Sequence, residues 1–380
     1  MNNSVMMKRK MKKKVLIFIP RLGGGGAERV ASIIANYLVE KYEVQITTLV
    51  SGESFYPIKD SVKITSANCR INRNSKIARR ISMGKNFLRS IVFVRKTIKE
   101  DKPDIVLSFL KEMDTVTFLA TRGLRGLKWV CSERNDPTST SKLRQLYYKS
   151  IYQRSDIMVC QSQAMVEYYS NVKRKVIIPN PVDFNNYPEH VEEQIPPKIV
   201  AVGRLVPQKN FEMLIESFAL ISNKYPEVTA TIYGEGSERK KLEALVVNKK
   251  LENRVFLPGA TCNVLEEIRD AAIFVFPTNY EGFPNALVEA IAMGIPVVST
   301  DFATGVAKEI VDEDVGIIVP CGDTKAFAEA MDILLANPEK RAYIRSVSRK
   351  AVESFAVEKV IEKWDRLFET LMEGNKCQDQ

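Results

Sequence analysis

The strongest constraint on the fold is an alternation between short apolar runs and longer stretches with helical periodicity, which recurs along the chain. The short runs are rich in Val and Ile and are apolar almost throughout, rather than at every second position. That pattern is typical of strands buried on both faces of a parallel sheet built from βαβ units. We therefore expect strands, in two sets, at residues 14–20, 43–50, 104–110, 128–132, 156–162 and 176–180, and at 198–205, 228–234, 254–259, 272–278, 296–300 and 316–320.

The two sets are separated by a polar stretch with four prolines and no periodicity, residues 180–198. At 380 residues the chain is also too long for one ordinary core and suits two domains of about 150–200 residues each. We predict an α/β fold of two Rossmann-like, doubly wound domains that face a cleft. The predicted parts are residues 1–183, a linker at 184–197, residues 198–355, and a final helix at 356–380 that packs back toward the first domain.

Histidine and cysteine usage excludes several kinds of active site. His190, the only histidine, lies in the predicted linker, so the chain cannot supply a Ser-His-Asp triad or a histidine-ligated metal. The six cysteines are scattered and form no CxxC pair, which fits a reducing compartment and suggests no zinc site. The short run at 15–19 lacks a signal-peptide cleavage site, and no stretch approaches the ~20 apolar residues of a membrane span. We expect a cytoplasmic protein, or one that rests on a membrane surface.

Charge is divided unevenly between the two halves. Residues 1–190 contain 34 Lys and Arg against 16 Asp and Glu, a net charge of +18, whereas the remainder has 22 against 30, a net charge of −8. A basic first half suggests an anionic partner, for which nucleic acid, anionic lipid and a phosphorylated substrate all qualify.

Four glycines, Gly23 to Gly26, join the first predicted strand to a helix. Glycine allows a ligand to approach the backbone closely, and the free N–H groups of a helix start favour an anion. The loop is not GxGxxG, and no acidic residue closes the second strand, so the dinucleotide interpretation is weak. A tight loop without a ligand is the alternative.

The second domain opens with Arg204 and Lys209 around a Pro-containing turn that follows its first strand. A guanidinium fork and an ammonium on one turn could clamp a diphosphate, although two such cations could equally be solvated.

Glu281 and Glu289 lie eight residues apart, around a helix that we expect to begin near Pro284. The N–H groups of Asn285, Ala286 and Leu287 would then be free for phosphate oxygens. Each carboxylate can accept from two vicinal hydroxyls. Glutamate also simply favours the first turns of a helix, but cations, N–H groups and carboxylates beside one cleft together indicate a sugar nucleotide.

These motifs resemble those of the retaining GT-B glycosyltransferases of family 4, which assemble bacterial polysaccharides. The matching pieces are "GGGGAERV", "VGRLVPQKN", "IYGEGSERKKLE" and "EGFPNALVEAIAMGIPVVST", in the family's order, over roughly residues 14–360. The spacing of Glu281 and Glu289 fits the family's E-x7-E pattern.

The resemblance implies roles for individual residues. Arg204, Lys209 and Glu281 would be catalytic, with the two cations neutralising the leaving diphosphate and Glu281 holding the donor hexose. Glu289 would hold the ribose hydroxyls. The remaining donor-binding residues would be Gly24, Gly25, Gly26, Gly203, Gly234, Gly236, Gly259, Gly282, Phe283, Pro284, Asn285, Ala286 and Leu287.

One stretch departs from the family pattern. Many members carry a histidine after the strand that corresponds to residues 128–132, where this chain has Glu133, Arg134 and Asn135. The stretch resembles a subgroup that acts on lipid-linked oligosaccharides, which implies contacts to sugar or acceptor. Solvated loop residues are the alternative.

The resemblance implies retention at the anomeric carbon, with the donor phosphate taking the acceptor proton. We expect no metal and no cofactor. The one Asp-x-Asp sequence, Asp312 and Asp314, is interpreted as a turn and not as a metal site. The donor would be a hexose or N-acetylhexosamine carried on a nucleotide, most commonly UDP in this family. The acceptor would be a glycan on polyprenyl diphosphate, in capsule, exopolysaccharide or O-antigen synthesis.

Residues 73–100 combine near-helical apolar spacing with many cations. Such a helix can lie on an anionic membrane, here the inner face of the plasma membrane, or it can pack into the core with a solvated basic face.

Three other classes share some of these features. A GT-B sugar-nucleotide epimerase or hydrolase would have the fold but would not need the two glutamates at this spacing. A nucleic-acid-binding protein would fit the charge, yet the basic half shows no aromatic interleaving or binding motif. An NAD-dependent oxidoreductase lacks its fingerprint acid. We therefore expect a glycosyltransferase that does not bind nucleic acid.

Overall fold

A computed structural model describes residues 12–69, 76–137, 140–184, 187–188 and 196–373, with the side chains of the second helix described from Ser82 onward. The predicted linker histidine, His190, lies outside these residues, as do residues 73–75 of the basic stretch.

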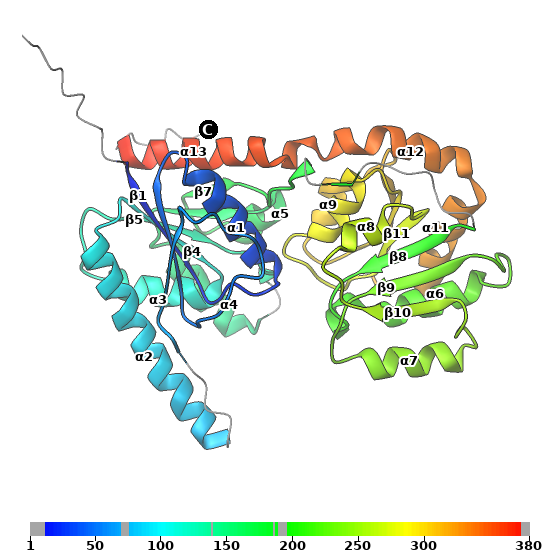
Figure 1. Cartoon of the computed structure of the whole chain (residues 1–380), viewed down its shortest axis with the longest axis horizontal. Helices are drawn as coiled ribbons and strands as arrows, with labels where there is room; N and C mark the ends of the chain where they lie inside the picture. Colours follow the sequence, from blue (N-terminus) through cyan, green and yellow to red (C-terminus); the bar gives the residue numbers. More distant parts are fainter. Residues whose placement is uncertain (1–11, 70–75, 138–139, 185–186, 189–195, 374–380) are drawn as a thin grey trace, which may run out of the picture.

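Two parallel sheets, each covered by helices on both faces, form the two halves of the molecule (Figure 1). The order in the first sheet is β3-β2-β1-β4-β5-β6-β7 and in the second β10-β9-β8-β11-β12-β13. The first-sheet strands are β1 (Lys14–Ile19), β2 (Glu43–Thr48), β3 (Lys63–Ser66), β4 (Ile105–Phe109), β5 (Lys128–Ser132), β6 (Ile157–Cys160) and β7 (Lys175–Ile177). The second-sheet strands are β8 (Lys198–Val202), β9 (Thr229–Tyr233), β10 (Val255–Gly259), β11 (Ile273–Phe276), β12 (Val297–Asp301) and β13 (Gly316–Pro320). The predicted α/β architecture of two parallel sheets is confirmed.

Helices follow most strands, as expected for right-handed βαβ units. The first half contains α1 (Gly26–Leu38), α2 (Lys76–Asp101), α3 (Lys111–Thr121), α4 (Lys142–Tyr152) and α5 (Gln163–Tyr168). The second contains the 3₁₀ turn η3 (Pro207–Lys209), α6 (Phe211–Ile221), α7 (Arg239–Asn248), α8 (Val264–Ile268), α9 (Asn285–Ala292), α10 (Val306–Ile310), α11 (Thr324–Ala336) and α12 (Pro338–Ala351). The chain then runs through η4 (Glu353–Phe355) into α13 (Val357–Glu373).

Strand β3 was not anticipated from the sequence. It has only four residues, and its side chains are exposed or half-buried. A short edge strand of this kind needs no continuous apolar run, because only one of its edges is paired and its faces meet solvent. The apolar signal that located the other strands is therefore absent from it.

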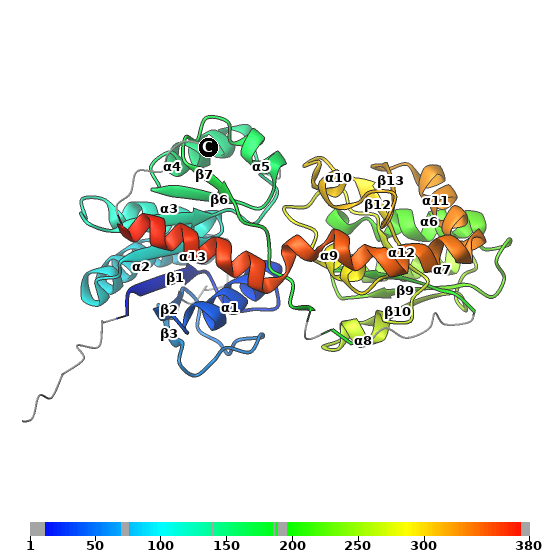
Figure 2. The same cartoon turned by 90° about the horizontal axis from the view of Figure 1, so that it is seen from above.

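The chain passes between the halves twice, and the two crossings are hydrogen-bonded to each other. The Val182 N–H donates to the Phe355 carbonyl at 2.8 Å, and the Val357 N–H donates to the Val182 carbonyl at 3.0 Å. Beyond this bridge α13 lies over the first half, whereas α12 lies over the second (Figure 2). Trp364 and Phe368 of α13 are fully buried in the core that α1 forms with the first sheet.

Candidate functional site

Glu281 lies in the loop between β11 and α9, where it is only 8% exposed. Its Oε1 accepts hydrogen bonds from Lys209 Nζ at 2.6 Å and from Thr278 Oγ1 at 2.9 Å. The same ammonium lies 4.7 Å from the centre of the Phe276 ring. No described residue donates to Oε2, so one oxygen fixes the carboxylate and the other remains available.

The Glu281 loop and the turn that carries Lys209 are bonded to each other, although about seventy residues separate them in sequence. The Gln208 carbonyl accepts from the Asn279 N–H at 2.8 Å and lies 3.1 Å from Thr278 Oγ1, the hydroxyl that contacts Glu281. The Gln208 side chain donates in turn to the Tyr280 carbonyl at 2.7 Å. These bonds hold the cation and the carboxylate in one rigid unit.

Helix α9 begins at Asn285, directly after Pro284, close to the predicted start. The expectation that three N–H groups would be free there is wrong for two of them. The Asn285 N–H donates to the Phe283 carbonyl at 3.1 Å, and the Leu287 N–H donates to the Pro284 carbonyl at 3.0 Å. Both N–H groups are therefore bonded to carbonyls of the tight turn before the helix and are not free for a ligand. Among the described backbone groups, only the Ala286 N–H of these three lacks a backbone partner.

Two side chains of α9 connect the halves. Glu289, 8% exposed, forms an ion pair with Arg29 of α1 through Oε1. One turn earlier, Asn285 Oδ1 accepts from Asn180 Nδ2 at 2.7 Å. Both carboxylates singled out in the sequence therefore lie on or beside α9, but Glu281 pairs within its own half and Glu289 pairs with the opposite half.

The predicted glycines lie at backbone contacts. Gly25 caps α1 and Gly26 begins it, with Gly24 just before. A Cβ on Gly26 would lie 2.6 Å from the Asn285 side-chain nitrogen, and one on Gly282 would lie 2.6 Å from the Arg134 carbonyl. These glycines allow loops of opposite halves to touch.

The loops that follow β8, β9 and β10 meet in the second half. The Gly203 N–H donates to the Tyr233 carbonyl at 3.0 Å, and the Gly234 N–H donates to the Gly259 carbonyl at 2.8 Å. A Cβ on Gly236 would strike the backbone of Leu205. Arg204 lies in the first of these loops with an exposed side chain, for which no described residue provides a hydrogen-bond or ion-pair partner. The two predicted cations thus differ, since Lys209 is already paired.

Phe283, Pro284, Ala286 and Leu287 face different surroundings. Phe283 packs edge-on against Phe355 with ring centres 5.5 Å apart, and Leu287 is fully buried in the core of the second half. Pro284 is buried and Ala286 is half-buried. Their side chains belong to the packing of the second half, and contacts between their backbones and a ligand stay a prediction.

Glu133 and Arg134 are buried rather than solvated. Glu133 Oε1 accepts from the N–H groups of Arg134 and Asn135 at 3.0 and 2.9 Å, and Oε2 accepts from Tyr152 at 2.9 Å. Lys111 Nζ lies 3.6 Å from Oε2. Burial raises the pKa of Glu133. Its carboxylate has no exposed surface and fixes the loop by accepting hydrogen bonds from the loop backbone. Asn135, in contrast, is exposed.

The Arg134 guanidinium lies between the Phe109 ring at 5.3 Å and the Trp364 ring at 5.9 Å. It donates to Asn180 Oδ1 at 2.5 Å, which links it to Asn285. Burial lowers the pKa of Arg134 to about 9, so the group remains charged at neutral pH.

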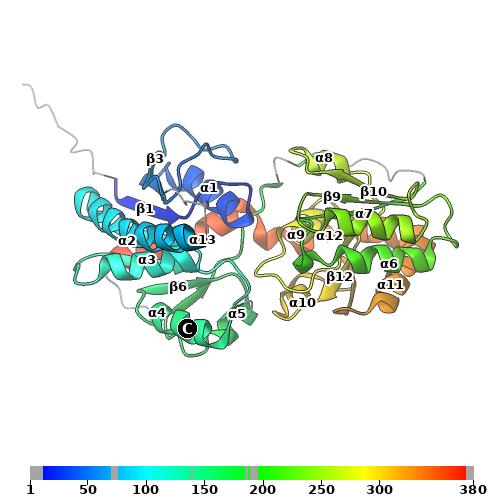
Figure 3. The same ribbon diagram turned by 90° about the horizontal axis from the view of Figure 1, so that it is seen from below.

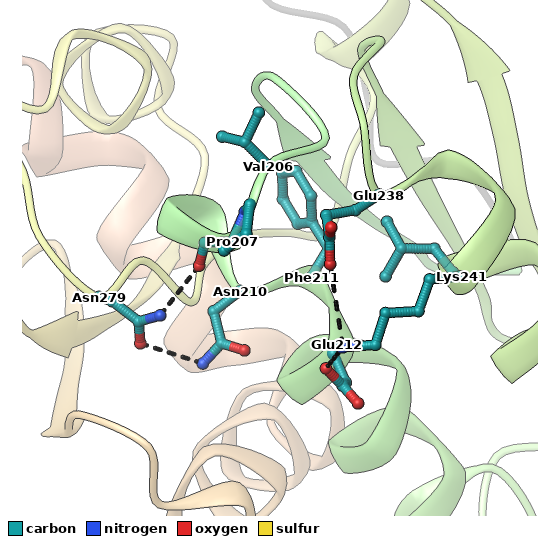
Figure 4. A pocket seen from close by; sticks show the side chains of 9 residues that line it. Val206, Pro207, Asn210, Phe211, Glu212, Glu238, Lys241 and Asn279 are labelled. Carbon is teal, nitrogen blue, oxygen red and sulfur yellow. Dashed lines mark hydrogen bonds and ion pairs between the residues drawn. The ribbon is translucent and has the colours of Figure 1, made fainter.

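A pocket of about 220 Å³ lies beside η3 (Figure 4). Its lining consists of Val206, Pro207, Asn210, Phe211, Glu212, Glu238, Lys241, Leu242 and Asn279. None of the predicted site residues lines it. It is also smaller than the roughly 300–1,000 Å³ of typical ligand pockets, and Lys241 already pairs with Glu212.

Asp312 and Asp314 form a turn, as expected, with the Asp314 N–H donating to Asp312 Oδ1 at 3.0 Å. Within the part of the chain that the structure describes, no three His, Cys, Asp or Glu side chains form a group that could hold a metal ion.

The basic helix α2 packs against α3, with α4 beyond it, on one face of the first sheet (Figure 3). Val94 and Ile98, toward its end, are buried, but Leu88 and Val92 are 65% and 67% exposed. On α4, Leu143 and Leu146 are 81% and 64% exposed. Exposed cations accompany them at Lys85, Arg89, Lys96, Lys142 and Arg144. No helix among the described residues is long and apolar enough to cross a bilayer.

Comparison with known proteins accounts for this arrangement. A model of "Glycosyltransferase Family 4" matches residues 24–186, and one of "Glycosyl transferases group 1" matches residues 184–351. The chain is 27% identical, over 93% of its length and 98% of the relative's, to the GalNAc-alpha-(1->4)-GalNAc-alpha-(1->3)-diNAcBac-PP-undecaprenol alpha-1,4-N-acetyl-D-galactosaminyltransferase of Campylobacter jejuni.

It is also 26% identical to the poly(ribitol-phosphate) alpha-N-acetylglucosaminyltransferase of Staphylococcus aureus, over 89% of this chain and 70% of the relative. Anabaena HepE, solved with UDP and glucose, superposes with a TM-score of 0.76 at 18% identity, over 94% of this chain and all of that one. These matches and the two facing sheets define a glycosyltransferase with the GT-B fold. Within that class, the chain belongs to glycosyltransferase family 4.

Sequence reasoning missed three residues that the structure brings to this site: Arg29, Thr278 and Asn180. Arg29 follows the glycine loop by one helical turn. A long cationic side chain at that position can reach beyond the start of the helix, so the sequence alone could have indicated Arg29 as a site residue. Thr278 lies two residues after the end of β11, and its hydroxyl could have been noted as a partner for the acid three residues later. Asn180 carries no comparable signal.

Proposed function

We propose that the protein is a retaining, metal-independent glycosyltransferase that moves a hexose or N-acetylhexosamine from a UDP-sugar to a lipid-linked glycan in bacterial surface polysaccharide synthesis. The observation that carries the proposal is the pair of buried glutamates at α9, each fixed through one oxygen by a cation. The second oxygen of each is then oriented to accept from the hydroxyls of a sugar and of a ribose.

The donor diphosphate would lie between the glycine loop before α1 and the start of α9. Arg204, which is exposed and without a protein partner among the described residues, is available to bind it. Lys209 is held against Glu281, so it contributes positive charge from a fixed position. Preorganised charge of this kind stabilises a departing diphosphate without reorganisation during the reaction.

In the proposed transfer, the bond between the anomeric carbon and the diphosphate oxygen breaks as the acceptor hydroxyl oxygen bonds to the same face of that carbon. The acceptor proton passes to the departing diphosphate, so no enzyme base is required. An α-linked donor then yields an α-linked product, and the two relatives above are both named as alpha-transferases. Proton NMR of the product tests retention, and a β-linked product would contradict it.

UDP is proposed as the nucleotide because HepE was solved with UDP. A polyprenyl-diphosphate acceptor is proposed because the Campylobacter relative is named for one. The face formed by α2 and α4 would bring the enzyme to that acceptor, since exposed apolar side chains among cations suit the surface of an anionic membrane. We expect Leu143→Asp together with Leu146→Asp to reduce sedimentation with anionic vesicles. Unchanged sedimentation would contradict this use of α4.

Thermal unfolding with UDP, GDP, NAD and short RNA tests the donor. A ligand at about 100 times its dissociation constant adds roughly 2.7 kcal/mol. We expect UDP to raise the melting temperature of the wild type and Glu289→Ala to lose most of that shift. Stabilisation by RNA or NAD, with none by UDP or GDP, would reject the proposal.

A further inference from the structure

Arg29 is the cation that the first half presents to the donor site. It lies on α1 one turn after Gly26, and its side chain reaches Glu289 of the opposite half. The side chain is 27% exposed, so it is neither a free surface group nor sealed in the core. Tyr56 and Tyr187 are its other close electrostatic neighbours, and the attraction of Glu289 raises the pKa of Arg29.

The ion pair uses only a small part of the guanidinium. One nitrogen, Nη1, donates to Glu289 Oε1, and the Tyr187 side chain also interacts with the guanidinium. A guanidinium has five N–H donors in a planar fork, a geometry that matches phosphate oxygens. Glu289 and Tyr187 do not occupy all five donors, so part of the fork is available beside α9.

Location decides what the free donors would meet. Gly26, at the start of the helix that carries Arg29, abuts the Asn285 side chain at the start of α9. A diphosphate placed at these two helix starts would lie within one helical turn of Arg29. Of the two cations that the sequence indicated for a diphosphate, Lys209 is committed to Glu281. Of these two, Arg204 is therefore the one left without a described partner.

We propose that Arg29 is a further donor-site residue, which keeps one N–H on Glu289 and binds the diphosphate of the nucleotide with the rest of its guanidinium. This inference rests on the proposed function. In this arrangement residues of both halves form the donor site: the second half binds the nucleoside, and the first half binds its phosphates. Glu289 then has two tasks, because one oxygen positions Arg29 while the other accepts from the ribose.

A series of ligands that differ only in phosphate content tests the proposal. Calorimetry would measure uridine, UMP and UDP binding to wild type, Arg29→Ala and Arg29→Lys. We expect Arg29→Ala to weaken UDP binding about tenfold or more but to change uridine binding little. Arg29→Lys should fall between, because an ammonium keeps the charge but loses the fork.

Lys41→Ala is the matched control, since Lys41 lies just beyond the far end of α1 and pairs with Glu369 on the surface. It changes the net charge by the same amount and should leave all three affinities unchanged. Equal losses for uridine and UDP in Arg29→Ala would mean that Arg29 only positions Glu289, and tighter binding would mean that it competes with the ribose. Either result overturns the inference. If the wild type binds none of the three ligands, the proposed function itself fails.

Discussion

Glu133 of the first half and Glu281 of the second each follow a strand of a parallel sheet, and each has a lysine beside its carboxylate, at 3.6 and 2.6 Å. Their remaining partners differ. Both oxygens of Glu133 are occupied, by two backbone N–H groups and a tyrosine hydroxyl. Glu281 uses one oxygen and leaves the other without a described donor. A completed set of partners is what we expect of a structural acid. An incomplete set is what we expect of an acid that binds a ligand, which is our proposal for Glu281.

Removing the structural acid should have the largest effect on stability. Glu133→Ala removes the carboxylate beside the Lys111 ammonium, and this lysine is only 5% exposed. Loss of one member of a buried pair costs about 3–5 kcal/mol. Urea denaturation would measure the loss, with exposed Glu112→Ala as the control. Near-wild-type stability with lost activity would instead make Glu133 a ligand-binding residue and remove the contrast.

Glu281→Gln should show the opposite signature. The amide keeps the size of the side chain, but it removes the charge that holds Lys209, so the transfer rate should fall about 100-fold while the protein still folds. Initial rates with a UDP-sugar would measure the effect. Glu243→Gln, which alters an exposed ion pair with Arg239 on α7, serves as the control. An active Glu281→Gln enzyme would place the chemistry elsewhere.

A second buried acid of the first half, Asp114, extends the comparison to the pH dependence of stability. Burial raises the pKa of Asp114 well above its ordinary value. The folded state therefore binds its proton more tightly than the unfolded state, and stability falls as pH rises from about 3.9 toward the raised pKa. Asp114→Asn cannot titrate and should flatten this part of the profile. Denaturation from about pH 4 to about pH 8 would measure it. An unchanged slope would mean that other groups cause the dependence.

The smallest effect is expected at the pocket beside η3. Lys241→Ala removes exposed ion pairs to Glu212 and Glu238, which are weak because solvent screens them. Melting temperature and UDP affinity should both stay within experimental error. A clear loss of UDP affinity would show that the donor uses this pocket and not the interface at α9.

The sequence was informative wherever the signal was local. Continuous β-branched runs located nearly every strand, because a strand buried on both faces must be apolar at each position. Pro284 located the start of α9 for an equally local reason. The two glutamates were found because both belong to one short segment.

Partner choice was not predictable, because it depends on contacts that are distant in sequence. Lys209 and Glu281 are 72 residues apart, and Arg29 and Glu289 are 260 apart. The local sequence "SERN" does not indicate that the Glu133 side chain is buried and accepts from backbone N–H groups of its own loop, while Asn135 is exposed. A polar residue after a buried strand has two such fates, and only the packing of the helices behind it, here α4 with Tyr152, decides between them.

The placement of α13 has a consequence for how the protein is made. Trp364 and Phe368 complete the core beside β1 and α1, yet they leave the ribosome after every strand of the second sheet. Domains generally fold as they are synthesised, beginning with the N-terminal one. In this protein the first half to emerge lacks part of its interior until the second half has been translated. The half that starts the chain is therefore the last to finish folding, and a nascent chain halted before α13 would expose the apolar surface that this helix covers.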